Sequence, residues 1–226
     1  MISYFDYQFR IIIIGDSMVG KSSFLRTFVK GTYSTVCDPT VGVDFYSRTV
    51  RVSGDKYVRL QFWDTAGQEK FRSIAKSYYR NCVGAFIMFD ITDRETYENV
   101  PSWYQEALSS IRCTSPVVVI VGHKADRQAE RQVTRLEAEC LAQRLGDHQY
   151  VETSSVTGQN IEKSVQMMAE VVYRNVIDGF YEELSSTGDW DGVKVSQNAA
   201  LAASIANQSL RIHNAEPEPS FGAGCC

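Results

Sequence analysis

The hydrophobic pattern of this 226-residue chain alternates between short apolar runs and segments with apolar residues three and four apart. Residues 10–14 form a β-branched run that indicates a buried strand, and the continuous apolar runs at 84–90 and 116–122 are typical of parallel strands that helices cover on both faces. Two further strand-like runs, 41–52 and 56–63, flank the turn residues Ser53-Gly54-Asp55 and indicate an antiparallel hairpin. A last short strand is expected at 149–153. The pattern predicts an α/β fold: a mostly parallel sheet with one antiparallel hairpin strand at its edge and helices on both faces.

Helical spacing follows several of these strands. Thr92-x-x-Glu95 resembles a capping box that would open a helix reaching to about residue 111, and Thr134-x-x-Glu137 opens another to residue 145. Apolar residues recur at helical spacing from about 160 to 177. Beyond 179 the periodicity fails and the chain turns to Ser, Asn, Ala, Gly and Pro. We therefore expect one domain over 8–178 and a flexible tail over 179–226.

The stretch Gly15-Asp-Ser-Met-Val-Gly-Lys-Ser22 fits the phosphate-loop pattern G-x-x-x-x-G-K-[ST] at every fixed position. It lies between the first apolar run and a helical segment, which is the setting that the motif requires. Backbone N–H groups of such a loop point at phosphate oxygens, Lys21 adds a charge at the β- and γ-phosphates, and Ser22 offers a hydroxyl to Mg²⁺. A glycine turn in an ordinary strand–helix unit is the alternative, and the complete motif disfavours it. The motif predicts a P-loop NTPase-type sheet but leaves the base open, because kinases and ATPases share it.

Composition narrows the class of protein. The net charge is −4 and no basic stripe appears, which argues against a nucleic-acid-binding surface. No run approaches the roughly 18 apolar residues of a membrane span, and the first residues do not form a secretory signal. We expect a cytosolic chain. Cys37, Cys82, Cys113 and Cys140 lack metal-ligand spacing and are interpreted as reduced thiols.

Further short motifs accompany the phosphate loop: Pro39-Thr40, Val41-Gly-Val-Asp-Phe45, Arg59-Leu-Gln-Phe-Trp63, Asp64-Thr-Ala-Gly-Gln-Glu69, Lys70-Phe-Arg72, Tyr78-Tyr-Arg80 and Met88-Phe-Asp-Ile-Thr92. Over residues 8–178 and the last two cysteines, the chain resembles the Ras superfamily and, within it, the Rab small GTPases. The stretches 37–45, 7–10 and 190–194, with His123, are most similar to the Rab thirty-nine branch. The resemblance implies a switch that cycles between GTP-bound and GDP-bound states, hydrolyses GTP and regulates vesicle trafficking.

The resemblance implies roles for residues around the phosphates. Thr40 and Asp64 would hold Mg²⁺ together with Ser22. Gly67 would give its N–H to the γ-phosphate, and Gln68 would position the attacking water, with Lys21 as the second catalytic residue. Taken singly, Thr40 and Asp64 are better interpreted as a loop threonine and a strand-end aspartate; both together, at this spacing from the phosphate loop, favour the metal role.

The resemblance also implies how the base is read. The Asp126 carboxylate would accept from guanine N1–H and the 2-amino group, the Lys124 stem would lie on the ring, and Tyr33 would pack on the base edge. The other implied nucleotide contacts are Ser17, Val19, Gly20, Ser23, His123, Ser154, Ser155 and Val156. Two departures are present: the family usually has Asn at the position of His123, and an alanine–lysine pair at Ser155-Val156. We expect looser nucleotide retention without loss of specificity.

Two further groups of residues are implied to meet partners. Phe45, Trp63 and Tyr78 match the aromatic residues through which Rabs present their switches to effectors; a core role is the alternative, and for Trp63 it is equally good. Cys225 and Cys226 resemble the doubly geranylgeranylated Rab terminus and do not form a C-a-a-X box, the alternative being two free thiols.

The implied partners are an exchange factor, an activating protein, an escort protein with geranylgeranyl transferase, a GDP-dissociation inhibitor, effectors and the membrane itself. The implied location is the cytoplasmic face of endomembranes, such as the Golgi, endosomes, lysosome-related organelles or vesicles, with a cytosolic pool. The tail beyond 179 carries only Lys194 and Arg211 as basic residues, so its electrostatic attraction to anionic lipid is expected to be weak. Partner proteins are therefore expected to determine the membrane to which the protein binds.

Two other classes of function remain to be compared. A GTP-bound adaptor that barely hydrolyses would act by binding alone, and the intact Gln68 speaks against it. An ATP-dependent P-loop kinase would need a lid for a phosphate acceptor, which the sequence does not reveal, and Asp126 favours guanine over adenine.

Overall fold

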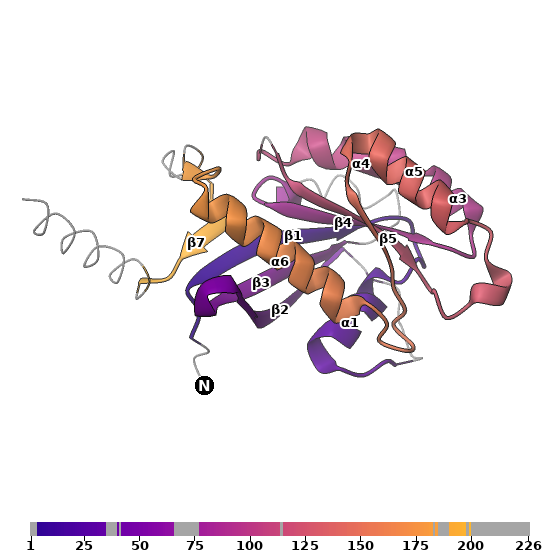
Figure 1. Ribbon diagram of the computed structural model, residues 1–226, viewed down its shortest axis with the longest axis horizontal. Helices are drawn as coiled ribbons and strands as arrows, with labels where there is room; N and C mark the ends of the chain where they lie inside the picture. The colour runs from indigo at the N-terminus through magenta and orange to yellow at the C-terminus, as the bar shows by residue number, and fades with distance from the viewer. Residues whose placement is uncertain are drawn as a thin grey trace, which may run out of the picture.

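A seven-stranded sheet organises the protein (Figure 1). The computed structural model describes residues 4–34, 40, 42–65, 77–113, 115–182, 184, 190–197 and 199. Within them the strands are β1 (Tyr7–Ile14), β2 (Val43–Val52), β3 (Lys56–Thr65), β4 (Gly84–Asp90), β5 (Val117–His123), β6 (Gln149–Glu152) and β7 (Val193–Val195). Six strands follow the order β2-β3-β1-β4-β5-β6, and β7 pairs with β1 beside this path.

The strand directions confirm the predicted sheet. β1 pairs in parallel with β3 and β4, and β5 pairs in parallel with β4 and β6. β2 is the antiparallel edge strand and forms a hairpin with β3 through the 3₁₀ turn η1 (Ser53–Asp55). Gly54 adopts a left-handed conformation (φ +69°) in that turn, where a side chain would be strained.

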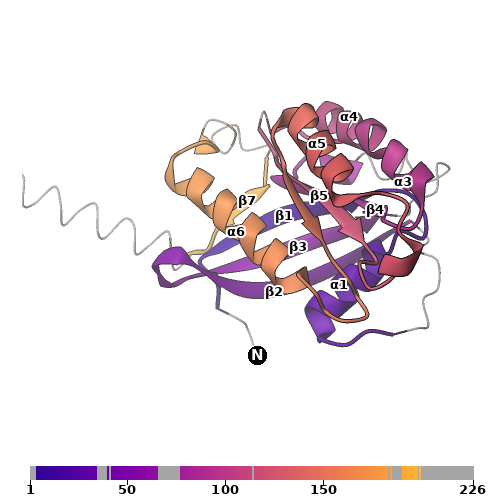
Figure 2. The same ribbon diagram turned by 45° about the vertical axis from the view of Figure 1, so that its right-hand side comes forward.

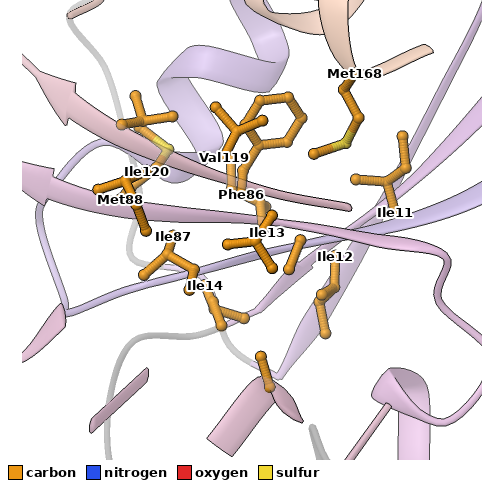
Figure 3. Close-up of a cluster of buried hydrophobic side chains, with 14 of the residues drawn as sticks. Ile11, Ile12, Ile13, Ile14, Phe86, Ile87, Met88, Val119, Ile120 and Met168 are labelled. Carbon is orange, nitrogen blue, oxygen red and sulfur yellow. The ribbon is translucent and has the colours of Figure 1, made fainter. Parts of the chain in front are cut away.

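The core lies on the central strands. All seven residues of β4 are buried, and so are Ile11–Ile14 of β1, because these strands have helices on both faces. Figure 3 shows Ile11–Ile14 and the β4 residues Phe86–Met88 beside Val119 and Ile120 of β5 and beside Met168. Helices α1 (Lys21–Lys30) and α6 (Ile161–Ile177) contact each other and β2, and Figures 1 and 2 show α6 crossing the sheet over β1 and β3. Helix α4 (Val100–Ser110) packs on β4, and α5 (Arg135–Gly146) packs on β6.

The predicted capping box of α5 is confirmed. The Thr134 hydroxyl accepts from the Glu137 backbone N–H at 3.3 Å, and the Glu137 carboxylate accepts from the Thr134 backbone N–H at 2.9 Å. The two bonds satisfy N–H groups that the first turn leaves without helical partners. A short 3₁₀ helix, η3 (Gln128–Glu130), precedes α5.

The single helix predicted from Thr92 to about residue 111 is wrong. The structure has α3 (Arg94–Glu98) followed directly by α4. Asp93 caps α3 by accepting from the Glu95 N–H at 3.2 Å, whereas the Thr92 hydroxyl donates to Asp90 at 2.7 Å. The break follows from Pro101 in the first turn of α4, because proline has no N–H to continue the preceding helix but fits the start of a new one.

The flexible tail predicted from residue 179 does not hold for residues 190–197. β7 pairs antiparallel with the start of β1, and the buried Trp190 stacks on Tyr181 with 5.7 Å between ring centroids. The polar average composition of the tail conceals one aromatic anchor and two β-branched residues, Val193 and Val195. Cys225 and Cys226 lie outside the described residues. No helix of the described chain has both the length and the apolar composition to cross a membrane.

Candidate nucleotide-binding site

The phosphate loop joins β1 to α1, and its two invariable motif glycines are required by packing. A Cβ at Gly15 (φ +138°) would lie 2.1 Å from the Met88 carbonyl oxygen, and one at Gly20 (φ +103°) would lie 2.5 Å from Cδ2 of His123. The loop is therefore pressed against β4 and β5. Helix α1 begins at Lys21 without a side-chain cap from the described residues, so its first N–H groups can serve an anion.

Lys21 is held inside this loop. Its buried Nζ donates to the carbonyl oxygens of Gly15 at 2.8 Å and Asp16 at 2.7 Å. Burial lowers the pKa of Lys21 to about 8, although the charges of Asp64 and Asp16 act in the opposite direction. The ammonium group is therefore already placed within the loop that would surround the phosphates.

Asp16 is a site residue that the sequence reasoning missed. Its carboxylate accepts from the side-chain amide of Asn99 at 2.8 Å and from the indole N–H of Trp103 at 2.7 Å. The N-cap residue of α4 and a residue of its first turn thus hold the phosphate loop from the side. Asp16 occupies a variable position of the motif, and its partners are more than 80 residues away, so no local signal could have identified them.

The three predicted metal ligands meet in space. Ser22 opens α1, Thr40 follows that helix, and Asp64 ends β3. The Ser22 and Thr40 hydroxyl oxygens are 2.8 Å apart, and the Ser22 hydroxyl donates to Oδ2 of Asp64. Asp64 is buried, and this burial raises its pKa to about 6.

The donor set of this cluster suits Mg²⁺. Oδ1 of Asp64 is buried and has no hydrogen-bond partner among the described residues, so it is available to a cation. Hydroxyl and carboxylate oxygens are hard ligands, and Mg²⁺ commonly takes one or two of them from the protein and the others from water and phosphate. The described residues contain no group of three His, Cys, Asp or Glu that could hold a metal. The cluster fits Mg²⁺ through the hydroxyls of Ser22 and Thr40 and through the unpaired oxygen of Asp64.

His123 ends β5 between the phosphate loop and the loop after β6. Its Nδ1 lies 2.8 Å from the Thr153 hydroxyl and its Nε2 lies 2.9 Å from the Ser155 hydroxyl. The ring also packs against Gly20 and lies edge-on to Phe24 at 6.2 Å between centroids. Burial lowers the pKa of His123 to about 4, so the imidazole is neutral at neutral pH. His123 is hydrogen-bonded to the loop after β6 and in packing contact with the phosphate loop.

The other residues expected to read the base come from the loops after β5 and β6. The Ser154 hydroxyl donates to Asp126 at 2.5 Å. The Lys124 ammonium pairs with the Asp90 carboxylate at 2.6 Å. Burial alone would raise the pKa of Asp90, but the hydrogen bonds from Lys124 and Thr92 outweigh burial and keep this pKa below its usual value. Asp90, at the end of β4, is a second residue without a predicted role that the structure places here.

The remaining predicted contacts differ in exposure. Ser17, Tyr33 and Val156 are exposed, Val19 is buried, and Ser23 is half-buried. The Thr27 hydroxyl of α1 donates to the Ser155 carbonyl at 3.4 Å, which joins the helix after the phosphate loop to the base loop. Gly67 and Gln68 lie outside the described residues.

The three predicted effector residues form one aromatic cluster. Phe45 of β2 lies directly opposite Trp63 of β3, with 5.1 Å between ring centroids, and Tyr78 lies 4.9 Å from Trp63. Phe45 is 49% exposed, and Trp63 and Tyr78 are half-buried. The cluster therefore presents aromatic surface to solvent, beside the strand end that carries Asp64.

The fold and this site define a class of protein: the model of the Ras family matches residues 10–174, and the chain belongs to that family of small GTPases. It is 47% identical over 192 residues to human Ras-related protein Rab-39A, an alignment that covers 83% of this chain and 87% of the relative. It is 43% identical over 224 residues to rab-39 of Caenorhabditis elegans, covering 98% and 93%, and 40% identical to mouse Rab-42 over 192 residues, covering 84% and 87%. The chain is a Rab-type small GTPase near the Rab-39 group. It binds and hydrolyses GTP and acts in vesicle trafficking, with regulators and effectors, at endomembranes.

Proposed function

We propose that GTP binds on the loop Gly15–Gly20 with its Mg²⁺ at Ser22, Thr40 and Asp64. The observation that carries this proposal is the convergence of these three oxygen donors, from positions far apart in the chain, next to the buried Lys21. When bound, Mg²⁺ would neutralise charge on the β- and γ-phosphates. The other residues of the loop, Ser17, Val19 and Ser23, would surround the phosphates.

The protein's part in hydrolysis is then positioning and charge stabilisation. Lys21 would keep its ammonium at the β- and γ-phosphates, where its pKa of about 8 leaves it mostly protonated at neutral pH. From its motif position, Gly67 would donate a backbone N–H to the γ-phosphate. Gln68 would accept a hydrogen bond from the attacking water and donate one to a phosphate oxygen. The γ-phosphate would order the segment around Thr40, so loss of this phosphate would release that segment.

The base would be guanine, read by Asp126. A carboxylate accepts from both N1–H and the 2-amino group, a pair of donors that adenine does not present. The bond from Ser154 supports this role by orienting Asp126. Lys124 would leave Asp90 or share it while its stem covers the ring, Tyr33 and Val156 would flank the base, and the Ser155 N–H would meet the guanine carbonyl. His123 would hold this loop through Ser155, with looser nucleotide retention than a carboxamide at the same place.

The exposed cluster of Phe45, Trp63 and Tyr78 would receive effectors when the segments around Thr40 and Gln68 are ordered. An exchange factor and an activating protein would set the nucleotide state. An escort protein and geranylgeranyl transferase would modify Cys225 and Cys226, and a GDP-dissociation inhibitor would extract the lipidated protein. These partners would place it on the cytoplasmic face of the Golgi, endosomes, lysosome-related organelles or vesicles, with a cytosolic pool.

Asp126→Asn tests the assignment of the base. Xanthine carries an oxygen where guanine has the 2-amino group, and a carboxamide can donate to that oxygen, so preference should move from GTP to XTP. Competition binding with GTP, XTP and ATP measures the change. Asp55→Asn, in the exposed hairpin turn, is the matched control and should keep the GTP preference. If Asp126→Asn also keeps it, another group reads the base.

The nucleotide that remains with the protein after gentle purification distinguishes the alternatives. GDP is expected for a protein that hydrolyses GTP. Bound GTP would identify an adaptor with little hydrolysis, and bound adenine nucleotide would contradict the proposed base site.

A further inference from the structure

The tail segment Trp190–Ser196, here called the docked tail segment, occupies a strand position that the rest of the sheet leaves open. β4 pairs with β1 only from Ile11 onward, so the same side of β1 at Tyr7–Phe9 has no partner in β4. β7 fills that side, pairing Val193 with Phe9 and Val195 with Tyr7. Without it, the edge would present unpaired backbone donors and acceptors, which is a template for another strand.

Backbone hydrogen bonds extend this pairing at both ends of β7. The Arg10 N–H donates to the Gly192 carbonyl at 3.0 Å, while the Arg10 carbonyl accepts from Val83 N–H at 2.9 Å. Beyond β7, the Ser196 N–H donates to the Asp6 carbonyl at 2.8 Å. The backbone of β1 is thus shared between the tail and the chain that leads into β4.

Asp191 gives the docking its specificity. Its carboxylate pairs with the Arg10 guanidinium at 2.7 Å and with Lys194 at 3.1 Å, and it accepts from the Asn81 side-chain amide at 2.6 Å. Three groups from three parts of the chain therefore converge on one carboxylate of the tail. A polar tail that touched the domain at random would not place one carboxylate against both a half-buried arginine and the Asn81 amide.

Gly192 and Trp190 supply the steric part of the docking. The buried Trp190 ring stacks on Tyr181 and folds back over Gly192. A Cβ at Gly192 would lie 2.4 Å from the Trp190 ring and 2.6 Å from the Asn81 carbonyl oxygen. Only glycine fits between the tryptophan and the backbone of residue 81.

We propose that the docked tail segment is an intramolecular latch, and that the β1 edge with Arg10, Asn81 and Tyr181 is its receptor surface. Because β7 runs antiparallel to β1, and β1 leads into the phosphate loop, the chain leaves Ser196 heading away from the nucleotide site. Figure 1 shows β7 at the opposite end of β1 from α1. The latch fixes the departure point of the tail at this end of the domain.

The latch also sets how far the domain can stand from residue 226. Residues 197–226 are 30 residues, against the 48 of 179–226. At about 3.4 Å per extended residue, the longest reach falls from about 160 Å to about 100 Å. A protein that binds the tail as an extended chain around Trp190 has to compete with β1 for it.

Trypsin offers an internal comparison, because the full-length protein has one cleavage site in the latch, Lys194, and one further along the same tail, Arg211. Cleavage requires the chain to leave the sheet, so its rate follows the population of the released form. The initial rates are read by mass from the fragments that begin at residues 195 and 212. A synthetic peptide of residues 186–216 provides the ratio of the two rates for a free chain.

We expect the Lys194 to Arg211 rate ratio to be at least about tenfold lower in the GDP-loaded protein than in the peptide. Gly192→Ala should raise the ratio close to that of the peptide, and Asp191→Asn should give a ratio between those of the wild-type protein and the peptide. Gly222→Ala is the same exchange outside the latch and should keep the wild-type ratio. Bound nucleotide, measured in the same samples, should equal the wild-type amount in all of them, which separates the latch from the proposed nucleotide site. An equal ratio in wild-type protein and peptide would overturn the latch, and so would protection that persists in Gly192→Ala.

Discussion

Acid should destabilise this GTPase through His123, which is buried between the phosphate loop and the loop after β6. Burial lowers its pKa from 6.5 to about 4, and the nearby Lys124 charge acts in the same direction. In the unfolded chain the imidazole regains its ordinary pKa, so between about pH 6.5 and 4 the unfolded state binds more protons than the folded state. The free energy of unfolding is therefore unaffected above this window and falls as the pH is lowered through it. A difference of about 2.5 pKa units corresponds to about 3 kcal/mol when the window has been crossed.

Urea unfolding at pH values from 7.5 to 5 measures this effect, with GDP and Mg²⁺ held at fixed saturating concentrations. His123→Asn should reduce the slope of unfolding free energy against pH by about 1.4 kcal/mol per unit below pH 6. His148→Asn is the comparison variant: burial also lowers the pKa of His148, but this residue is only half-buried and lies 3.0 Å from the Tyr104 hydroxyl, away from the site, so its loss of slope should be smaller. Asp64, whose pKa is raised to about 6 by burial, is common to all three proteins and cancels in the comparison. A wild-type slope in His123→Asn, or a larger loss of slope in His148→Asn, would refute the reasoning.

Three further predictions concern the switch and its tail. Ser22→Asn should lower GTP affinity at least about tenfold while GDP binding changes less, because the hydroxyl that is proposed to bind Mg²⁺ is lost; equilibrium titration with both nucleotides measures this. Gln68→Leu should keep GTP binding but slow single-turnover hydrolysis at least about tenfold with an activating protein present, and an unchanged rate would remove Gln68 from water positioning. Replacing Cys225 and Cys226 by Ser should leave nucleotide binding intact but move the protein from membranes to the soluble fraction of cells, and replacing one should give partial binding; a double variant that still sediments with membranes would contradict the lipid anchor.

Much of the fold was predictable because its signals are local. The continuous apolar runs of β4 and β5, the turn at Ser53–Asp55 and the capping box at Thr134 each lie within a few residues and require no distant partner. The start of α3 was misplaced by one residue because two neighbouring residues, Thr92 and Asp93, can both cap a helix. Asp93 is the cap because the Thr92 hydroxyl already donates a hydrogen bond to Asp90.

Long-range contacts account for what the sequence did not reveal. β7 is three residues long, and its partner strand lies more than 180 residues earlier, so no periodicity identifies it. The grouping of Ser22, Thr40 and Asp64 was predictable because each belongs to a motif whose place at a strand or helix end is readable. The hydrogen bonds of His123 to Thr153 and Ser155 were not, since their geometry depends on how β5 and β6 align.

The hold of Asn99 and Trp103 on Asp16 changes how variation in this protein should be interpreted. Neither side chain belongs to a nucleotide-binding motif: Asn99 lies between α3 and α4, and Trp103 lies in α4, in a region that sequence alone would treat as scaffold. Yet each donates directly to Asp16, in the loop that is proposed to surround the phosphates. A substitution at either position therefore belongs with those in the phosphate loop. It should be assayed first for nucleotide exchange, before it is classified as a folding variant.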